Sequence, residues 1–243
     1  MEQQVLAASG PSYRNTGWAA IISGVVGILA FGLLLDTTLT RVSWVPSDRI
    51  YLLFNTHDIG VALQFFLLIL VPFGLRTLSQ QSPPGFSKVL FRTGVGALSV
   101  VVLLVLLGIG SKLISNGYYM FPQGIFGIWL ILVNWRLSGS LPGWLRWAGM
   151  IVGLGLVLVG VSFVGIGFVY PSMMAIPPAP IETVKEVNSP ANTFFHQLLR
   201  YASFVGVALL PVWTILIGLQ LLKKRAGPSH QGGGIPNASD SSS

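Results

Sequence analysis

The sequence contains no cysteine and very few charged side chains. The lack of cysteine excludes disulfides, thiolate metal sites and cysteine nucleophiles. Only 9% of the 243 residues are Asp, Glu, Lys or Arg, whereas about a quarter of a soluble domain is charged. A chain with so little polar surface cannot cover a globule in water. We therefore expect lipid to solvate much of it, as one compact bundle.

Motifs of the common enzyme classes are also lacking. The sequence has no GxSxG, no HExxH and no GxxxxGK[ST], so it offers no signature of a serine hydrolase, a zinc protease or a P-loop nucleotide site. Its acids and histidines lack the spacing of a three-ligand metal centre. No basic run is interleaved with aromatics in the manner of a nucleic-acid-binding face. We therefore expect no enzymatic activity, no metal and no nucleic-acid partner.

Long apolar stretches dominate what remains, since 52% of the residues are hydrophobic and the mean hydropathy is +0.73. A membrane-spanning helix needs about 20 apolar residues to cross the roughly 30 Å hydrocarbon core. Six stretches reach or approach this length: 17–36, 51–74, 92–114, 118–136, 143–170 and 195–222. The pattern predicts an all-α integral membrane protein, a six-helix bundle over 17–222. We expect residues 1–16 to be a cytoplasmic segment and residues 223–243 a disordered tail.

The distribution of positive charge predicts the orientation of these helices. With a cytoplasmic N-terminus, nine of the fourteen Lys and Arg residues fall on the inner side: Arg14, Arg76, Lys88, Arg92, Arg136, Arg146, Lys223, Lys224 and Arg225. Five fall on the outer side: Arg41, Arg49, Lys112, Lys185 and Arg200. The excess predicts that both termini are cytoplasmic and that the number of crossings is even.

Ionisable side chains inside the predicted spans are the main candidates for function. The second span reads FNTHDIGVALQFFLLILVPFGL (54–75) and places Asp58 about 10 Å below the outer boundary, at 1.5 Å per residue. A mid-membrane Asp costs about 2.5–3.5 kcal/mol, so it usually faces the bundle interior and has a partner. Arg200 lies at a comparable depth in the sixth span. We predict an Asp58–Arg200 ion pair, with His57 or His196 beside it.

Other polar residues are expected to join this pair in one pocket in the outer half of the bundle. Asn55 shares a helical face with Asp58, and Lys112 ends the third span on the outer side. One interpretation is a structural lock between helices, because interhelical polar contacts stabilise membrane bundles modestly. A second is a pathway for a solute or a proton, with a histidine titrating near neutral pH. A third is a haem held by His57 and His196.

Glycine and proline positions predict how the helices approach one another and where they bend. Gly149 and Gly153 form a GxxxG pattern in the fifth span, and small residues of this kind let membrane helices approach closely. Their role is packing within the bundle or, alternatively, a homodimer through the fifth helix. Pro72 and Pro211 lie near the expected cytoplasmic ends of the second and sixth spans, where they are expected to kink both helices.

The passage LPGWLRWAGMIVGLGLVLVGVSF (141–163), about a tenth of the chain, resembles the fifth-helix region of a family of uncharacterised bacterial multi-pass membrane proteins. In that family an LPxWLxWxG motif leads into a span rich in Gly and Leu. The resemblance implies a bacterial cytoplasmic membrane and no established activity. The His57–Asp58 pair does not match a hallmark of the family.

These observations lead to an expected function and two alternatives. We expect a non-enzymatic accessory or scaffold protein without a cofactor, whose polar cluster is mainly structural and whose contacts are membrane lipids and a second copy or a partner membrane subunit. The first alternative is a small-solute or proton-coupled transporter in which Asp58 and Arg200 line the pathway. The second alternative is a bis-histidine haem-binding membrane protein.

Overall fold

The computed structural model describes residues 13–39, 47–79, 87–111, 117–169 and 190–225. All secondary structure in these ranges is α-helical, which confirms the all-α part of the predicted fold class. The helices are α1 (Tyr13–Leu39), α2 (Ser47–Leu68), α3 (Val71–Ser79), α4 (Lys88–Ser111), α5 (Met120–Arg136), α6 (Gly143–Val169), α7 (Pro190–Gly206) and α8 (Leu209–Arg225). The predictions for 1–12, for Lys112 and for 226–243 lie outside the described residues.

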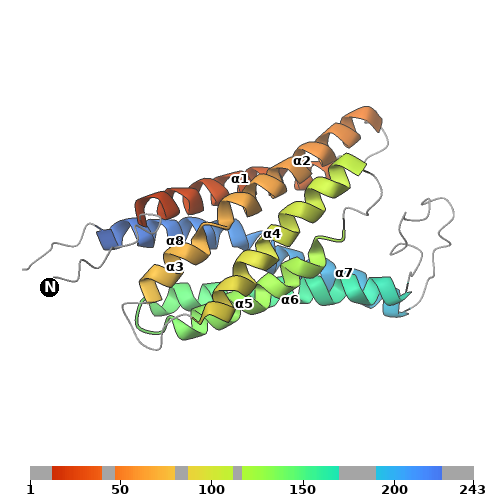
Figure 1. Cartoon of the computed structure of the whole chain (residues 1–243). Coiled ribbons are helices and arrows are strands. Elements are labelled where there is room, and N and C mark those ends of the chain that lie inside the picture. The colour runs from red at the N-terminus through yellow and green to blue at the C-terminus, as the bar shows by residue number, and fades with distance from the viewer. Residues whose placement is uncertain (1–12, 40–46, 80–86, 112–116, 170–189, 226–243) are drawn as a thin grey trace, which may run out of the picture.

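The helices form an elongated bundle in which α1, α2, α4, α5, α6 and the α7–α8 pair lie beside one another (Figure 1). The closest packing is between α5 and α6, between α1 and α8, between α1 and α2, and between α6 and α7. The start of α1 lies against the end of α8, because a Cβ on Gly17 would be 2.9 Å from the side chain of Leu222. The N-terminal end of α1 and the C-terminal end of α8 therefore lie at the same end of the bundle.

Within the described residues, five helical segments are long and apolar enough to cross a membrane: Arg14–Leu35, Leu52–Leu78, Lys88–Ile109, Gly143–Val169 and Pro190–Lys223. This is the pattern of a multi-pass membrane protein. The predicted span 118–136 forms α5, which has only 17 residues. At 1.5 Å per residue α5 is about 25 Å long, somewhat shorter than the roughly 30 Å hydrocarbon core.

Two of the membrane-length segments are interrupted where the sequence has a proline. The α2–α3 segment breaks at Ile69–Leu70 and the α7–α8 segment at Val207–Ala208. Pro72 and Pro211 follow these breaks, and a proline has no N–H to donate to the carbonyl four residues earlier. The second break differs from the sequence prediction in its position, because it lies near the middle of 190–225 and not near the helix end.

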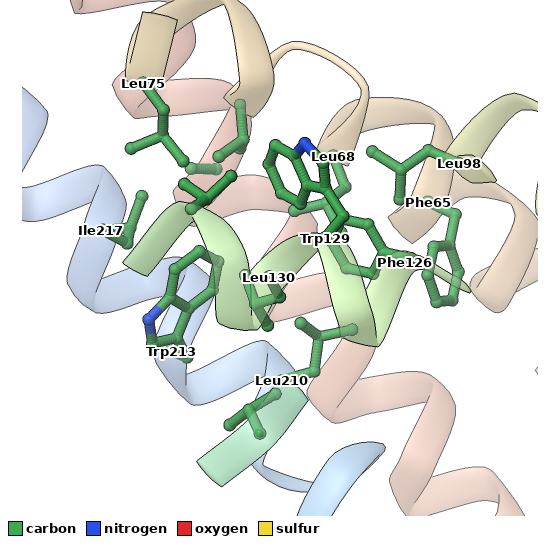
Figure 2. Packing of buried hydrophobic residues seen from close by; sticks show 14 of the residues in the cluster. Phe65, Leu68, Leu75, Leu98, Phe126, Trp129, Leu130, Leu210, Trp213 and Ile217 are labelled. Carbon is green, nitrogen blue, oxygen red and sulfur yellow. The ribbon is translucent and has the colours of Figure 1, made fainter. Parts of the chain in front are cut away.

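A core of large apolar side chains forms where α2, α4, α5 and α8 meet (Figure 2). Trp129 on α5 stacks on Phe126 with ring centroids 5.2 Å apart, and Phe65 on α2 meets Phe126 edge to face. The indole Nε1–H of Trp129 donates a 2.7 Å hydrogen bond to the carbonyl of Leu90 on α4. Trp129 therefore joins α4 to α5 by both packing and a hydrogen bond.

Glycines account for the close approach of α5 and α6. A Cβ on Gly127 would lie 2.5 Å from the carbonyl oxygen of Gly153, and a Cβ on Gly124 would lie 3.0 Å from the Cα of Gly160. Gly149, one turn before Gly153, is covered by the side chains of Asn134 and Trp213. The GxxxG face of α6 is thus occupied inside this bundle by α5 and α8.

Candidate functional site

Three polar side chains of α2, those of His57, Asp58 and Gln64, lie inside the bundle. His57 and Asp58 are each only 5% exposed, although they sit in a helix that otherwise reads as a membrane span. His57 Nδ1 lies 2.8 Å from the carbonyl oxygen of Ala30 on α1. Because a carbonyl can only accept, Nδ1 is the donor of this hydrogen bond. The hydrogen bond fixes the ring and ties α2 to α1.

A second polar contact joins the same two helices two turns further along α2. The hydroxyl of Ser23 donates a 2.9 Å hydrogen bond to the backbone carbonyl of Gln64. The side-chain amide of Gln64 lies over Gly27, where a Cβ would be 2.6 Å from the amide carbon. The amide can occupy this position only because residue 27 has no side chain.

The start of α5 supplies the opposite wall. Gln123 is only 2% exposed, and its backbone N–H donates to the carbonyl of Tyr119 one turn earlier. Tyr119, the residue before α5, and Gln123 line the same hollow as His57 and Gln64 of α2.

These side chains surround a small internal cavity of about 70 Å³. Its polar lining consists of His57, Gln64, Tyr119, Gln123 and Ser203, and we call it the polar cavity. The remaining lining residues are apolar. A water molecule occupies about 30 Å³ of liquid, so the polar cavity has room for a few waters and not for an ordinary metabolite.

The break between α7 and α8 lies at the edge of the polar cavity. The carbonyl of Ser203 accepts hydrogen bonds from the N–H groups of both Val207 and Ala208, at 2.8 and 3.0 Å. The bond to Ala208 spans five residues, as in the π-type turns that often occur at functional sites. Pro211 contributes to the break because it cannot donate to the carbonyl of Val207.

Gln64 and Gln123 are both buried, and both line the polar cavity. An amide buried without a hydrogen bond is costly, and a polar cavity with several convergent partners is where buried water is found. The arrangement therefore suits ordered water bridging α2 to α5.

The structure does not bring Arg200 or His196 to this cluster. Both are exposed on α7, which packs mainly on α6, whereas α2 packs on α1 and α4. Asp58 is buried on α2, and Arg200 is exposed on α7. The sequence places Asp58 and Arg200 at similar depths, but depth does not make their helices neighbours. In the structure α2 and α7 are not among the closely packed helix pairs. Asn55 is half-buried on α2.

The two histidines considered for a haem do not face each other. His57 is buried and bonded to Ala30, whereas His196 is exposed on a different part of the bundle. Across the described ranges, no group of three or more His, Cys, Asp or Glu side chains is arranged to hold a metal ion. The geometry therefore supplies neither a bis-histidine pair nor a multi-ligand centre.

The sequence analysis missed Tyr119 and Gln123 because it concentrated on ionisable residues. The signal was present, since Gln123 and Asn134 are the only amide side chains in the apolar stretch 118–136. An uncharged amide within a membrane span is subject to the same need for a partner as a charge, at lower cost.

Comparison with protein-family models, curated proteins and solved structures finds no match to this chain.

Proposed function

We propose that this chain is a non-enzymatic, six-crossing protein of the bacterial cytoplasmic membrane that acts as an accessory or scaffold subunit. The proposed crossings are α1, α2–α3, α4, α5, α6 and α7–α8, with both termini in the cytoplasm. The adjacent ends of α1 and α8 support an even number of crossings, and the excess of inner Lys and Arg supports the orientation. A bilayer thins locally to accommodate a short helix such as α5.

The observation that carries the proposal is that the polar cluster is small and bonded from helix to helix. His57 is bonded to Ala30 and Ser23 to the carbonyl of Gln64, so both contacts join α1 to α2. The polar cavity measures about 70 Å³, whereas sites for small molecules are usually about 300–1,000 Å³. These features favour a structural lock over a substrate pathway.

The outward face of α7 supports an accessory role. Only Ala202 and Gly206 of this helix are buried, while His196, Arg200 and Tyr201 are exposed. Arg200 lies about 10 Å from the middle of the 34-residue segment Pro190–Lys223. An arginine at that depth usually pairs with an acid or faces water. A partner membrane helix that presents a carboxylate would satisfy it.

The partner proposal is tested by placing a photo-crosslinking amino acid at Tyr201, which is 69% exposed, and at the matched apolar position Leu29 on α1, which is 65% exposed. In intact cells, we expect one discrete crosslinked product at position 201 and none at position 29. Arg200→Gln should abolish the product if the charge is recognised. A product that persists in Arg200→Gln, or equal products at both positions, would contradict the proposed interface.

A transport function is the second candidate, and the buried amides of Gln64 and Gln123, which line a cavity beside a broken helix, favour it. Transporters often place their sites where a discontinuous helix exposes backbone groups. Proteoliposomes with an internal pH dye and a light-scattering measurement of solute entry separate the two functions. We expect proton and small-solute permeability equal to that of protein-free vesicles. A flux that disappears in Gln123→Leu would replace the scaffold proposal with transport.

A further inference from the structure

Apart from the polar cavity, the described residues form an apolar groove of about 670 Å³ on the surface of the molecule. Its floor is α5, with Phe121, Pro122 and Ile125, and its walls are residues of α4 and α6. We call it the α4–α6 groove. Both walls belong to membrane-length segments, so the groove is continuous with the surface that faces lipid.

The groove follows from the length and packing of α5. This helix packs against both α4 and α6, but α4 and α6 are not among the closely packed pairs. Instead α4 crosses the bundle obliquely and its C-terminal part lies toward α2 (Figure 1). The helix α5 begins only at Met120, and its first residues lie at the bottom of the space between α4 and α6. Gly96 widens it, since a Cβ at that position would meet nothing within 4 Å.

The chemistry of the lining selects a hydrocarbon occupant. Nearly all of the lining is apolar, and its one threonine, Thr93, already donates its hydroxyl to the carbonyl of Val89. A polar ligand would therefore lose its hydrogen bonds to water without replacement. One water molecule occupies about 30 Å³ in the liquid. The groove therefore has room for roughly twenty groups of that size, such as the methylene groups of a lipid tail. This is the size of a single long acyl chain.

A row of α4 side chains indicates which lipid the groove receives. Lys88, Arg92, Gly96, Val100 and Leu104 follow one another at i, i+4 spacing, so each is next to the one before it, and the row turns about 40° around the helix at each step. The last three line the groove, while Lys88 and Arg92 are exposed at the start of the same row. From Arg92 to Leu104 the row is about 18 Å long, slightly more than half of the roughly 30 Å core. A lipid phosphate beside the two cations would thus place its acyl chain along the groove.

We propose that the α4–α6 groove binds one phospholipid with a net negative headgroup. The acyl chain lies on Gly96, Val100 and the floor of α5, and the headgroup phosphate lies at Lys88 and Arg92. The lipid fills the volume that the short helix α5 leaves open and holds α4 against the α5–α6 pair.

The test uses native mass spectrometry of the purified full chain, exchanged into detergent after incubation with phosphatidylglycerol or phosphatidylcholine vesicles. Wild type should retain one phosphatidylglycerol. Gly96→Leu fills the groove without a clash and should lower retention about tenfold, since the loss of roughly ten carbon–carbon contacts suffices for that factor. Val100→Phe should act in the same way. Gly32→Leu is the matched control, because a Cβ on Gly32 also meets nothing within 4 Å.

The headgroup is tested separately. Arg92→Gln and Lys88→Gln should each lower phosphatidylglycerol retention about fivefold and leave phosphatidylcholine retention unchanged, as expected for single cations near an anionic lipid. Arg14→Gln, also exposed, is the control for charge alone. Equal retention by wild type and both groove-filling variants would overturn the proposal. Lipid binding by a variant in which a Gly/Ser linker replaces residues 170–189, but not by the wild type, would also overturn it. In that case residues 170–189 themselves would be the occupant of the groove.

Discussion

The contact between α5 and α6 makes Gly127→Ala the sharpest single test of the fold. A Cβ at position 127 would lie 2.5 Å from the carbonyl oxygen of Gly153 and 2.8 Å from the nitrogen of Val157. Both are backbone atoms, so no side-chain rotation relieves the clash, and α6 must move away from α5. Ordinary contact begins at 3.4 Å, so α6 must move away from α5 by roughly 0.5–1 Å. A gap of about that size removes a quarter to half of the energy of an atomic contact.

The size of the effect follows from that loss. About fifty interhelical atom pairs at 0.1–0.2 kcal/mol each, weakened by roughly a third, give a destabilisation of about 2–3 kcal/mol. The higher helix propensity of alanine offsets up to about 1 kcal/mol of this. Gly96→Ala is the matched control, because it changes propensity alone in a helix where the new Cβ meets nothing within 4 Å.

The assay is reversible unfolding in mixed micelles, followed by far-UV circular dichroism as denaturing detergent is added. We expect the free energy of unfolding of Gly127→Ala to be about 2–3 kcal/mol below that of Gly96→Ala. Gly153→Ala, whose Cβ would lie 2.7 Å from the carbonyl of Gly127, should behave like Gly127→Ala. Equal stability of all three variants would show that α5 and α6 do not pack backbone to backbone.

Three further variants test the polar contacts and the helix break. Trp129→Phe removes the donor to the Leu90 carbonyl and should lower the free energy of unfolding by about 1–3 kcal/mol, whereas Trp135→Phe, at a 69% exposed position, should have no effect. Ser23→Ala removes the bond to the Gln64 carbonyl and should cost only about 0.6 kcal/mol, the usual value for interhelical bonds in a membrane. A loss above 2 kcal/mol would mean that this bond organises the cluster. Pro211→Ala restores an N–H that can reach the Val207 carbonyl, so hydrogen exchange of the amides from 203 to 208 should slow. Unchanged exchange would remove the proline as the cause of the break.

Helix positions were largely predictable from the sequence because lipid imposes a simple rule of length and hydropathy. The apolar stretch 143–170 corresponds to α6 within one residue at its C-terminal end. The glycine pattern also indicated where helices approach closely, since Gly149 and Gly153 lie in the α5–α6–α8 packing. The exact position of the break before Pro211 was not predictable, because the π-type turn at Ser203 depends on tertiary packing.

Which helices are neighbours was not predictable, and the candidate site depended on it. Asp58 and Arg200 were matched by depth alone, but α7 packs on α6 and leaves Arg200 exposed. Depth follows from counting residues, whereas adjacency follows from complementary surfaces that no single helix reveals. The polar cavity that His57 and Gln64 line is shared with Gln123 of α5 and with Tyr119 just before that helix. A bundle is therefore easier to outline from sequence than its interior is to assign.

Whether α5 crosses the membrane is the most direct test of the proposed six-crossing bundle. The polar cavity and the α4–α6 groove both depend on that helix being inside the bundle. The chain has no cysteine, so single cysteines introduced at Ser115 and Gly139 can be labelled with a membrane-impermeant maleimide. In intact cells, the account predicts labelling at position 115 and none at position 139, which should become reactive only after permeabilisation. Labelling of both positions from the same side would contradict it.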